Sequence, residues 1–189
     1  PRWWATDTYH WSSTRHHYQA YRLLLHMQRR DGLEMVNRLW HDSEAGEHPL
    51  VTYRRLKGWG QSQLNDFVYD YAKRDVTYGD RVRNMGQKLR KEENGYRRKD
   101  PHLLWRRHTM LEPVGNIDGR YRVPTHAAPQ DYGFNVIPLQ PVEKDRPVRV
   151  KFKGHTEVNA TAGWRYGFVT ENSTGRVESY SPMHAAESD

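Results

Sequence analysis

The sequence predicts an α+β fold in which an N-terminal helical lobe is followed by an antiparallel β-sandwich-like lobe. Apolar residues recur with a period of about 3.6 in the first half of the chain and with a period of two after about residue 103. Seven Trp and twelve Tyr supply large side chains for a core, although the mean hydropathy is −1.06 and 28% of the residues are charged. These patterns indicate a folded protein with helices first and strands second.

Start and stop signals divide the first half into five predicted helices. Ser12 or Ser13 is expected to cap the first, and Asp31-Gly32 to end it. Pro49 suits the first turn of the third helix, and Gly58 is expected to end that helix. The five segments are residues 12–30, 33–40, 49–57, 62–74 and 81–91.

The fourth helix carries the clearest apolar stripe, which begins after a predicted cap at Ser62. We expect the stripe to pack against the face of the first helix that carries Tyr18, Tyr21 and Leu25, because each apolar face needs a partner to leave water. The stripe consists of Leu64, Phe67, Val68, Tyr71 and Ala72.

The second half of the chain predicts strands joined by turns. A turn at 116–119 joins residues 109–114 to residues 120–123. A loop of hairpin composition at 171–175 separates residues 164–170 from residues 176–180. We therefore expect antiparallel pairing in this half of the chain.

Three further features complete the predicted organisation. Val148, Val150 and Phe152 alternate with basic residues, as in a half-buried strand. Residues 124–141, rich in Pro and Gly, form either the joint between two lobes or an ordered loop within one domain. We predict a helical domain at 1–103 and a β domain at 104–189, the latter ending in a disordered tail at 185–189.

The basic residues are concentrated in one segment. Residues 81–107 hold ten basic and three acidic residues, an excess that equals the net charge of +7 for the whole chain. Aromatic residues stand among these cations, a combination suited to an anionic polymer, an acidic polysaccharide or stacked bases. A solvated helix face is the simpler interpretation. The predicted binding residues are Tyr96, Arg97, Arg98, Lys99, Trp105, Arg106 and Arg107.

A second candidate surface lies in the predicted strand 164–170. Trp164, Tyr166 and Phe168 share one face of that strand, because alternate residues of a strand point the same way. That face either packs into the core of the sheet or forms a platform for sugar rings.

Several classes of catalytic and metal site lack their motifs. The chain has no cysteine, which excludes disulfides, thiolate nucleophiles and Cys-based zinc sites. It also lacks a Gly-x-Ser-x-Gly elbow and a Gly-rich phosphate loop. His16, His17 and His26 fall on different helix faces, which disfavours a preformed helical metal site, although His10 could converge with His16 or His17 through a loop. We expect no metal and no cofactor. Whether the chain is an enzyme stays open.

Paired carboxylates are the remaining candidates for acid and base catalysis. Asp66 and Asp70 stand four residues apart on the fourth helix, and Glu44 and Glu47 flank Gly46 in a loop. The aspartates lie off the apolar stripe, so a solvated polar face is the favoured interpretation.

Three segments carry a family resemblance. Residues 18–40, from Tyr18-Gln-Ala-Tyr to Asn-Arg-Leu-Trp40, resemble the helices that follow the zinc site in gluzincin-like metallopeptidases. Residues 129–137 and 163–169 look like the joint and the appended β-sandwich of uncharacterised secreted microbial proteins built on such a lobe. The His-Glu-x-x-His string that this zinc site needs is missing from the chain. The resemblance therefore implies a fold and no catalytic residue.

These observations lead to one expected function and two alternatives. We expect a secreted, non-catalytic portion of a gluzincin-like protein that binds an anionic polymer or a cell-surface glycan. The first alternative is a fragment of an active zinc metallohydrolase whose ligands come from a missing N-terminal segment or a second chain. The second is a nucleic-acid-binding protein. No apolar stretch is long enough to span a bilayer, and the start of the chain lacks the apolar core of a signal peptide.

Overall fold

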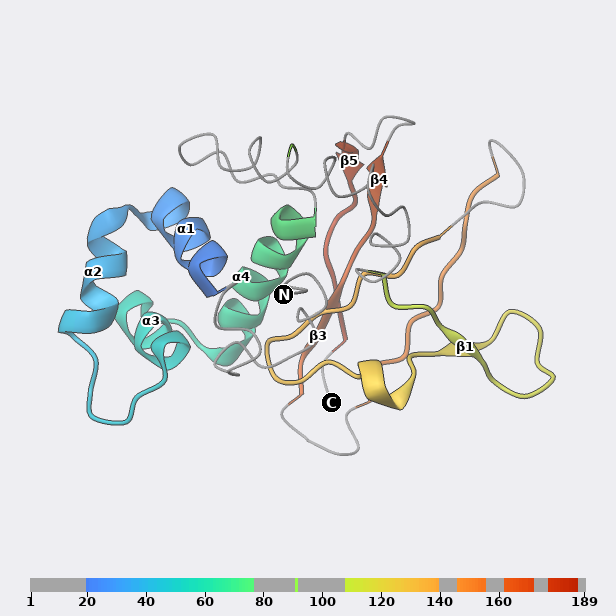
Figure 1. The fold of residues 1–189 in the computed structure, drawn as a ribbon, viewed down its shortest axis with the longest axis horizontal. Helices are drawn as coiled ribbons and strands as arrows, with labels where there is room; N and C mark the ends of the chain where they lie inside the picture. The colour runs from blue at the N-terminus through green and yellow to red at the C-terminus, as the bar shows by residue number, and fades with distance from the viewer. Residues whose placement is uncertain are drawn as a thin grey trace. The chain divides into compact units, whose positions relative to one another are not determined.

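The fold is α+β, as the sequence predicts. The computed structural model describes residues 20–76, 91, 108–139, 146–155, 162–171 and 177–186. Within these described residues, four α-helices come first and short antiparallel strands follow. Figure 1 shows this order along the chain. None of the helices within the described residues is long and apolar enough to cross a membrane.

The chain packs as two compact units, each built from segments that are far apart in sequence. The first unit contains residues 1–21 and 87–150, and the second contains residues 22–86 and 151–189. The second unit therefore combines most of the helical part of the chain with the last strands. The predicted domains at 1–103 and 104–189 stay a prediction.

The helix boundaries lie within two positions of those that the sequence signals indicate, apart from the start of the first helix, whose predicted cap at Ser12 or Ser13 lies outside the described residues. Gly32 and Gly58 follow two of them with positive φ angles of 87° and 65°, a conformation that favours glycine. At the start of the third helix, Pro49 occupies the first turn and the His48 side chain accepts a hydrogen bond from the Leu50 N–H at 3.2 Å. The helices are α1 (Ala20–Asp31), α2 (Leu33–His41), α3 (Pro49–Lys57) and α4 (Gln61–Val76).

The start of α4 differs from its predicted cap. The helix begins at Gln61 rather than after Ser62, because the Gln63 side chain accepts a hydrogen bond from the Gly60 N–H at 3.0 Å. A glutamine that reaches back to the N-cap amide is one half of a capping box. The Ser62 hydroxyl is thereby available for a different contact, with a strand of the same unit.

A buried core joins α1, α2, α3 and α4. The rings of Tyr53 and Phe67 lie at its centre, with their centroids 4.7 Å apart. Leu64, Phe67 and Tyr71 are buried as predicted, whereas Val68 is half-buried. The buried apolar side chains are Leu23, Met27, Leu39, Leu50, Tyr53, Leu64, Phe67, Tyr71 and Ala72.

The inward face of α1 is not the predicted one. Leu23, His26 and Met27 are buried, whereas Tyr21 and Leu25 are only half-buried and Tyr18 lies outside the described residues. The buried residues follow the i, i+3, i+4 spacing of a helix face. A histidine occupies the middle position, and a hydropathy pattern does not count histidine as apolar. This is why the pattern selects a neighbouring face.

The strands of the second unit form two separate antiparallel pairs. β3 (Trp164–Tyr166) pairs with β6 (His184–Ala186), and β4 (Val169–Glu171) pairs with β5 (Val177–Tyr180). The predicted hairpin around 171–175 is confirmed by the second pair. In Figure 1, α4 lies between the other helices and β3, with which it is in contact.

Two predictions for these strands need correction. The predicted strand 164–170 is interrupted at Gly167 and Phe168, so Phe168 does not continue the face of Trp164 and Tyr166. β6 includes Ala185 and Ala186, which composition assigns to a disordered tail. The backbone of these two residues pairs with β3, and such pairing does not depend on the residue type.

The described part of the first unit is a hairpin and a loop. β1 (Glu112–Pro113) pairs with β2 (Tyr121–Arg122) across the predicted turn. The loop that follows contains the 3₁₀ helix η4 (Thr125–Ala127). It is held by the Asn135 amide, which donates to the Thr109 hydroxyl at 2.7 Å and to the Ala127 carbonyl at 2.9 Å. Within this unit, residues 124–139 therefore form an ordered loop.

The predicted strand around Val148 and Val150 is wrong. Residues 146–155 are assigned to none of the strands in the described part of the chain, and the side chains of Val148 and Val150 are exposed. Alternation of apolar and basic residues describes an extended segment, and a β-strand needs a hydrogen-bonding partner as well. Apart from Lys91, the predicted helix at 81–91 lies outside the described residues.

Candidate functional site

A cluster of aromatic side chains covers one side of β3. Trp164 and Tyr166 stand two residues apart on the strand and point to the same face. The Phe152 ring packs against both, with centroid distances of 5.9 Å to Trp164 and 4.8 Å to Tyr166. His184 of β6 stacks on Tyr166 at 5.1 Å. These four residues, Phe152, Trp164, Tyr166 and His184, form what we call the aromatic cluster.

The aromatic cluster is neither a closed core nor an open platform. Phe152, Trp164 and Tyr166 are half-buried, and His184 is exposed. The rings meet at different angles, 64° between Phe152 and Trp164 and 24° between Tyr166 and His184. The rings pack on each other and still present surface to solvent.

Basic residues are the sequence neighbours of one member of the aromatic cluster, Phe152. Lys151 and Lys153 flank Phe152 along the chain, and both are exposed. His155 follows two residues later and is also exposed. These residues add positive charge to this part of the second unit.

Close contacts hold the β3 part of the aromatic cluster in place. The Trp164 Nε1–H donates to the carbonyl oxygen of His155 at 3.0 Å. Gly154 lies so close to the indole that a Cβ atom there would be 2.5 Å from Trp164 Cγ and 2.7 Å from Nε1. Real Cβ atoms do not approach other atoms this closely, so the indole position depends on glycine at residue 154.

Helix α4 supports the opposite face of β3. Arg165 is 5% exposed, and its Nε donates to Asp66 Oδ1 at 2.5 Å. The same guanidinium donates to the Ser62 hydroxyl at 2.8 Å. Asn65 and Tyr69 approach Gly163 and Gly167 at the two ends of the strand. The aromatic cluster is therefore built on a strand that is anchored to the helical core of the same unit.

The predicted carboxylate pair on α4 is partly exposed, and both carboxylates are ion-paired. Asp66 binds Arg165, and Asp70 lies 3.2 Å from Arg74, 3.3 Å from Lys73 and 3.4 Å from buried His26. The contacts with His26 and then with Arg74 hold the pKa of Asp70 well below its ordinary value. Neighbouring cations thus stabilise the charged form of this carboxylate, as expected of a structural ion pair.

The second carboxylate pair has a structural partner too. Glu47 lies 2.6 Å from the Arg55 guanidinium and accepts a hydrogen bond from the Thr52 hydroxyl at 2.9 Å. The Arg55 contact lowers the pKa of Glu47 to about 2. These contacts tie the loop before α3 to that helix. Among the described residues there is also no group of three His, Asp or Glu side chains placed to hold a metal ion.

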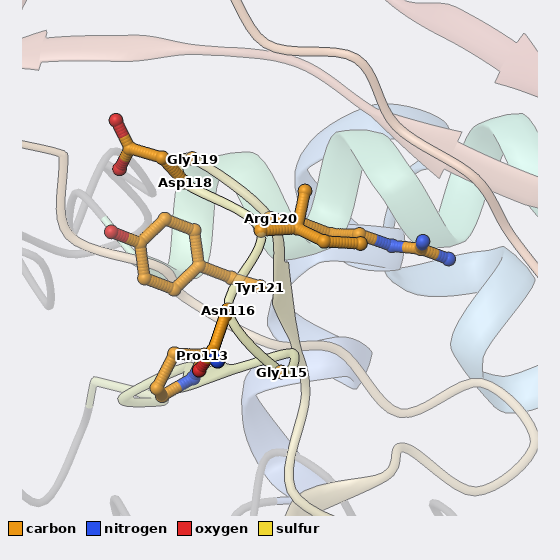
Figure 2. Close-up of a pocket in the computed structure, with 8 residues that line it drawn as sticks. Pro113, Gly115, Asn116, Asp118, Gly119, Arg120 and Tyr121 are labelled. Carbon is orange, nitrogen blue, oxygen red and sulfur yellow. The ribbon is translucent and has the colours of Figure 1, made fainter.

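A shallow hollow of about 310 Å³ lies at the β1–β2 turn. Figure 2 shows the Asp118 and Tyr121 side chains on one side of this turn and the Arg120 side chain extending away from them. Gly115 and Gly119 take positive φ angles of 58° and 73°, which are typical of a tight turn. The shape of the hollow therefore follows from the turn itself. Its lining is formed by Pro113, Gly115, Asn116, Ile117, Asp118, Gly119, Arg120 and Tyr121.

The predicted basic binding residues cannot be placed by the structure. Tyr96, Arg97, Arg98, Lys99, Trp105, Arg106 and Arg107 all lie outside the described residues. Sequence reasoning selected Trp164 and Tyr166 but missed Phe152 and His184 as their partners. The alternating pattern around Phe152 was the available signal, whereas nothing in the local sequence links His184 to β3.

One comparison with known proteins gives a match. Residues 1–189 match the model of a family described as a family of unknown function (DUF6055). No curated protein and no solved structure matches the chain. The resemblance to gluzincin-like metallopeptidases therefore stays a hypothesis.

Proposed function

Since this chain belongs to the DUF6055 family of unknown function, we propose a role from its own surface: it is a non-catalytic protein that binds an anionic polymer or a cell-surface glycan. The observation that supports this proposal is the half-exposed aromatic cluster, in which Phe152 is flanked along the chain by the exposed residues Lys151 and Lys153. Aromatic rings supply apolar contact area at a low cost in side-chain entropy, and lysines supply point charges for carboxylate, sulfate or phosphate groups.

The charge of the whole chain agrees with such a ligand. The net charge is +7, and the basic segment 81–107 accounts for an excess of that size. A positive field raises the local concentration of a polyanion and speeds its association. We therefore propose that Arg97, Arg98 and the neighbouring predicted residues help to attract the polymer.

Secretion is part of the same proposal. A cell-surface glycan is met outside the cell, and the resemblance to secreted microbial proteins suggests the same compartment. The absence of cysteine leaves the compartment open, because it neither requires nor forbids an oxidising one. Tracking the chain in culture supernatant and cell fractions tests this part independently of binding.

Two other functions remain as alternatives. Nucleic acid offers phosphates for the lysines and bases for the rings, so single-stranded DNA belongs among the tested ligands. A zinc hydrolase would need ligands from a further segment or a second chain. The nucleic-acid alternative predicts that the chain prefers DNA to acidic polysaccharide. The zinc hydrolase alternative predicts metal-dependent activity.

The proposal is tested by binding to heparin at several salt concentrations. Removing two cations at the aromatic cluster, with Lys151→Ala and Lys153→Ala combined, should weaken binding and lower the slope of log affinity against log salt by roughly two. The matched control is Arg120→Ala with Arg122→Ala, which removes two exposed cations from the β1–β2 hairpin. Equal losses in both double variants would show a non-specific charge effect, and no binding by the parent chain would refute the proposal.

A further inference from the structure

Helix α2 has a buried side and an exposed apolar side. Leu39 is buried and Met35 is half-buried. Leu33 and Trp40, by contrast, are 55% and 63% exposed. They stand seven residues apart, which puts them on one face of the helix because seven residues make nearly two turns. In Figure 1, α2 lies beyond α1 and α3 on the side away from α4 and β3, so this face is open to a partner.

Asn37 stands at the centre of the exposed face. It comes four residues after Leu33 and three before Trp40, and it is exposed as well. An amide side chain carries both donors and an acceptor, so two copies of it can exchange a pair of hydrogen bonds. A single asparagine in an apolar helix seam also fixes the register of paired helices. These three residues, Leu33, Asn37 and Trp40, form what we call the α2 face, and it is complementary to a second copy of itself.

Two polar side chains on one flank of the α2 face set the direction of pairing. Glu34 and His41 are both exposed, and Asp42 of the same chain lies 3.4 Å from His41 Nδ1. They stand three residues before and four residues after Asn37. An antiparallel pair about a two-fold axis at Asn37 brings equal flanks together, so the Glu34 carboxylate of each copy lies beside the imidazole of the other. A parallel pair brings unequal flanks together and makes neither contact.

We infer that a second copy of this chain covers the α2 face, in an antiparallel α2–α2 pair with Asn37 at the two-fold axis. Closed two-fold pairs are the commonest arrangement of identical subunits, and they use the same patch on both copies. A helix of 9 residues buries less than the roughly 1,200 Å² of a standard interface, so the pairing is weak, with a dissociation constant on the order of 100 µM. The inference concerns a different surface from the proposed binding function and does not depend on it.

Sedimentation equilibrium over a series of protein concentrations measures the association. The parent should change from monomer to dimer as the concentration rises through the expected dissociation constant. Trp40→Ala should weaken dimerisation by about tenfold or more, because aromatic residues at the centre of an interface carry much of the binding energy. Its monomer should keep the parent's stability at low concentration, since the contact is between copies. Tyr121→Ala is the matched control, because it removes another exposed aromatic side chain, and it should dimerise as the parent does.

An exchange of charges tests the direction of the pair. Glu34→Lys and His41→Glu should each weaken dimerisation several-fold, because each removes one side of the complementary contact. The variant that combines both changes places opposite charges together again and should dimerise at least as tightly as the parent. Losses that simply add in the combined variant would contradict the antiparallel arrangement.

Cysteine variants test the register, because the chain itself has no cysteine. Asn37→Cys should form a disulfide-linked dimer under mild oxidation, since residue 37 meets its own copy at the axis. Leu33→Cys should not, because antiparallel pairing separates the two copies of residue 33 by about 12 Å along the helix axis. A non-reducing gel separates the linked dimer from the monomer.

Three results would overturn the inference. The first is a parent that stays monomeric at concentrations well above the expected dissociation constant. The second is dimerisation that Tyr121→Ala abolishes and Trp40→Ala leaves intact, because the interface would then lie elsewhere. The third is crosslinking of Leu33→Cys without crosslinking of Asn37→Cys, which would indicate a parallel pair. None of these results bears on heparin binding, which tests the proposed function separately.

Discussion

Arg165 of β3 and Asp66 of α4, 99 residues apart in the chain, form an ion pair with an Nε–Oδ1 distance of 2.5 Å. Arg165 is nearly buried, whereas Asp66 is 44% exposed. The guanidinium also donates to the Ser62 hydroxyl. Charge-assisted hydrogen bonds of this kind are about twice as strong as neutral ones. This contact joins the helical core to the strand that carries Trp164 and Tyr166.

Replacing Arg165 should destabilise the second unit. Arg165→Ala removes hydrogen bonds to a charged partner and should lower the free energy of unfolding by about 1.5–3 kcal/mol. Arg38→Ala is the control, because its pair with Asp42 is exposed and should contribute only about 0.3–0.5 kcal/mol. Urea unfolding followed by circular dichroism measures both values. Equal losses would mean that the Arg165 contact does not join helix and strand.

Phe67 should be one of the most sensitive core positions. Its side chain is 1% exposed and contacts the rings of Tyr53 and His26. Phe67→Ala should therefore lower the free energy of unfolding by about 3–5 kcal/mol. Trp40, which is 63% exposed, provides an aromatic control, and its replacement by alanine should cost about 0.5 kcal/mol or less. A loss below about 1 kcal/mol for Phe67→Ala would place this helix outside the core.

Asp70 should make stability depend on acid pH. The pKa of Asp70 is lower in the folded protein than its ordinary value of 3.8. The charged carboxylate therefore stabilises the fold at pH values above 3.8. This stabilisation is lost as the pH falls through the pKa that Asp70 has in the folded protein. Asp70→Asn should lower the free energy of unfolding by about 1–3 kcal/mol at pH 7, because it leaves buried His26 with a weaker partner.

The difference between parent and Asp70→Asn should shrink as the pH falls below 3.8. Urea unfolding at pH 7, 5, 4 and 3 measures this trend. Glu34→Gln removes one exposed negative charge and controls for the change in net charge. A constant difference between parent and Asp70→Asn at every pH would contradict the assigned role of Asp70.

The basic segment predicts a separate effect on polyanion binding. Reversing Arg97 and Arg98 to Glu should abolish retention on heparin at physiological salt, because it changes the local charge by four units. Stability should change little, since exposed charges contribute little to folding. Thermal unfolding of the same variant provides the control. Retention equal to that of the parent would identify this segment as a solvated face.

Metal removal should have no effect on this chain. The sequence lacks the His-Glu-x-x-His spacing, and we predict no tight zinc site built from this chain alone. Thermal unfolding with and without a chelator should give the same midpoint. A lower midpoint in the chelator would favour the zinc hydrolase alternative over glycan binding.

Local sequence signals predict where the helices begin and end better than they predict which elements contact each other. Pro49, Gly32 and Gly58 act within their own turns, so their effects can be inferred from neighbouring residues alone. Turn composition likewise located the β1–β2 hairpin. The inward face of α1 was wrongly predicted, because buried His26 has a polar partner on a different helix, and such partnerships have no periodic signal.

The candidate site was only partly predictable for the same reason. Trp164 and Tyr166 share a strand face by their spacing of two, which the sequence displays directly. Phe152 and His184 reach them through tertiary packing. Phe152 lies 12 positions from Trp164, and His184 lies 18 positions from Tyr166. The close approach of Gly154 to the indole depends on main-chain geometry that no residue pattern specifies.

The central claim is that the aromatic cluster binds an acidic glycan, and the most direct test follows the Trp164 indole resonance during titration with a heparin hexasaccharide. The ¹H–¹⁵N signal, assigned with Trp164→Leu, should shift progressively and saturate, while the signal of exposed Trp40 should stay in place. Binding of the hexasaccharide with no change at Trp164 would contradict the account, because the ligand would then lie elsewhere on the chain.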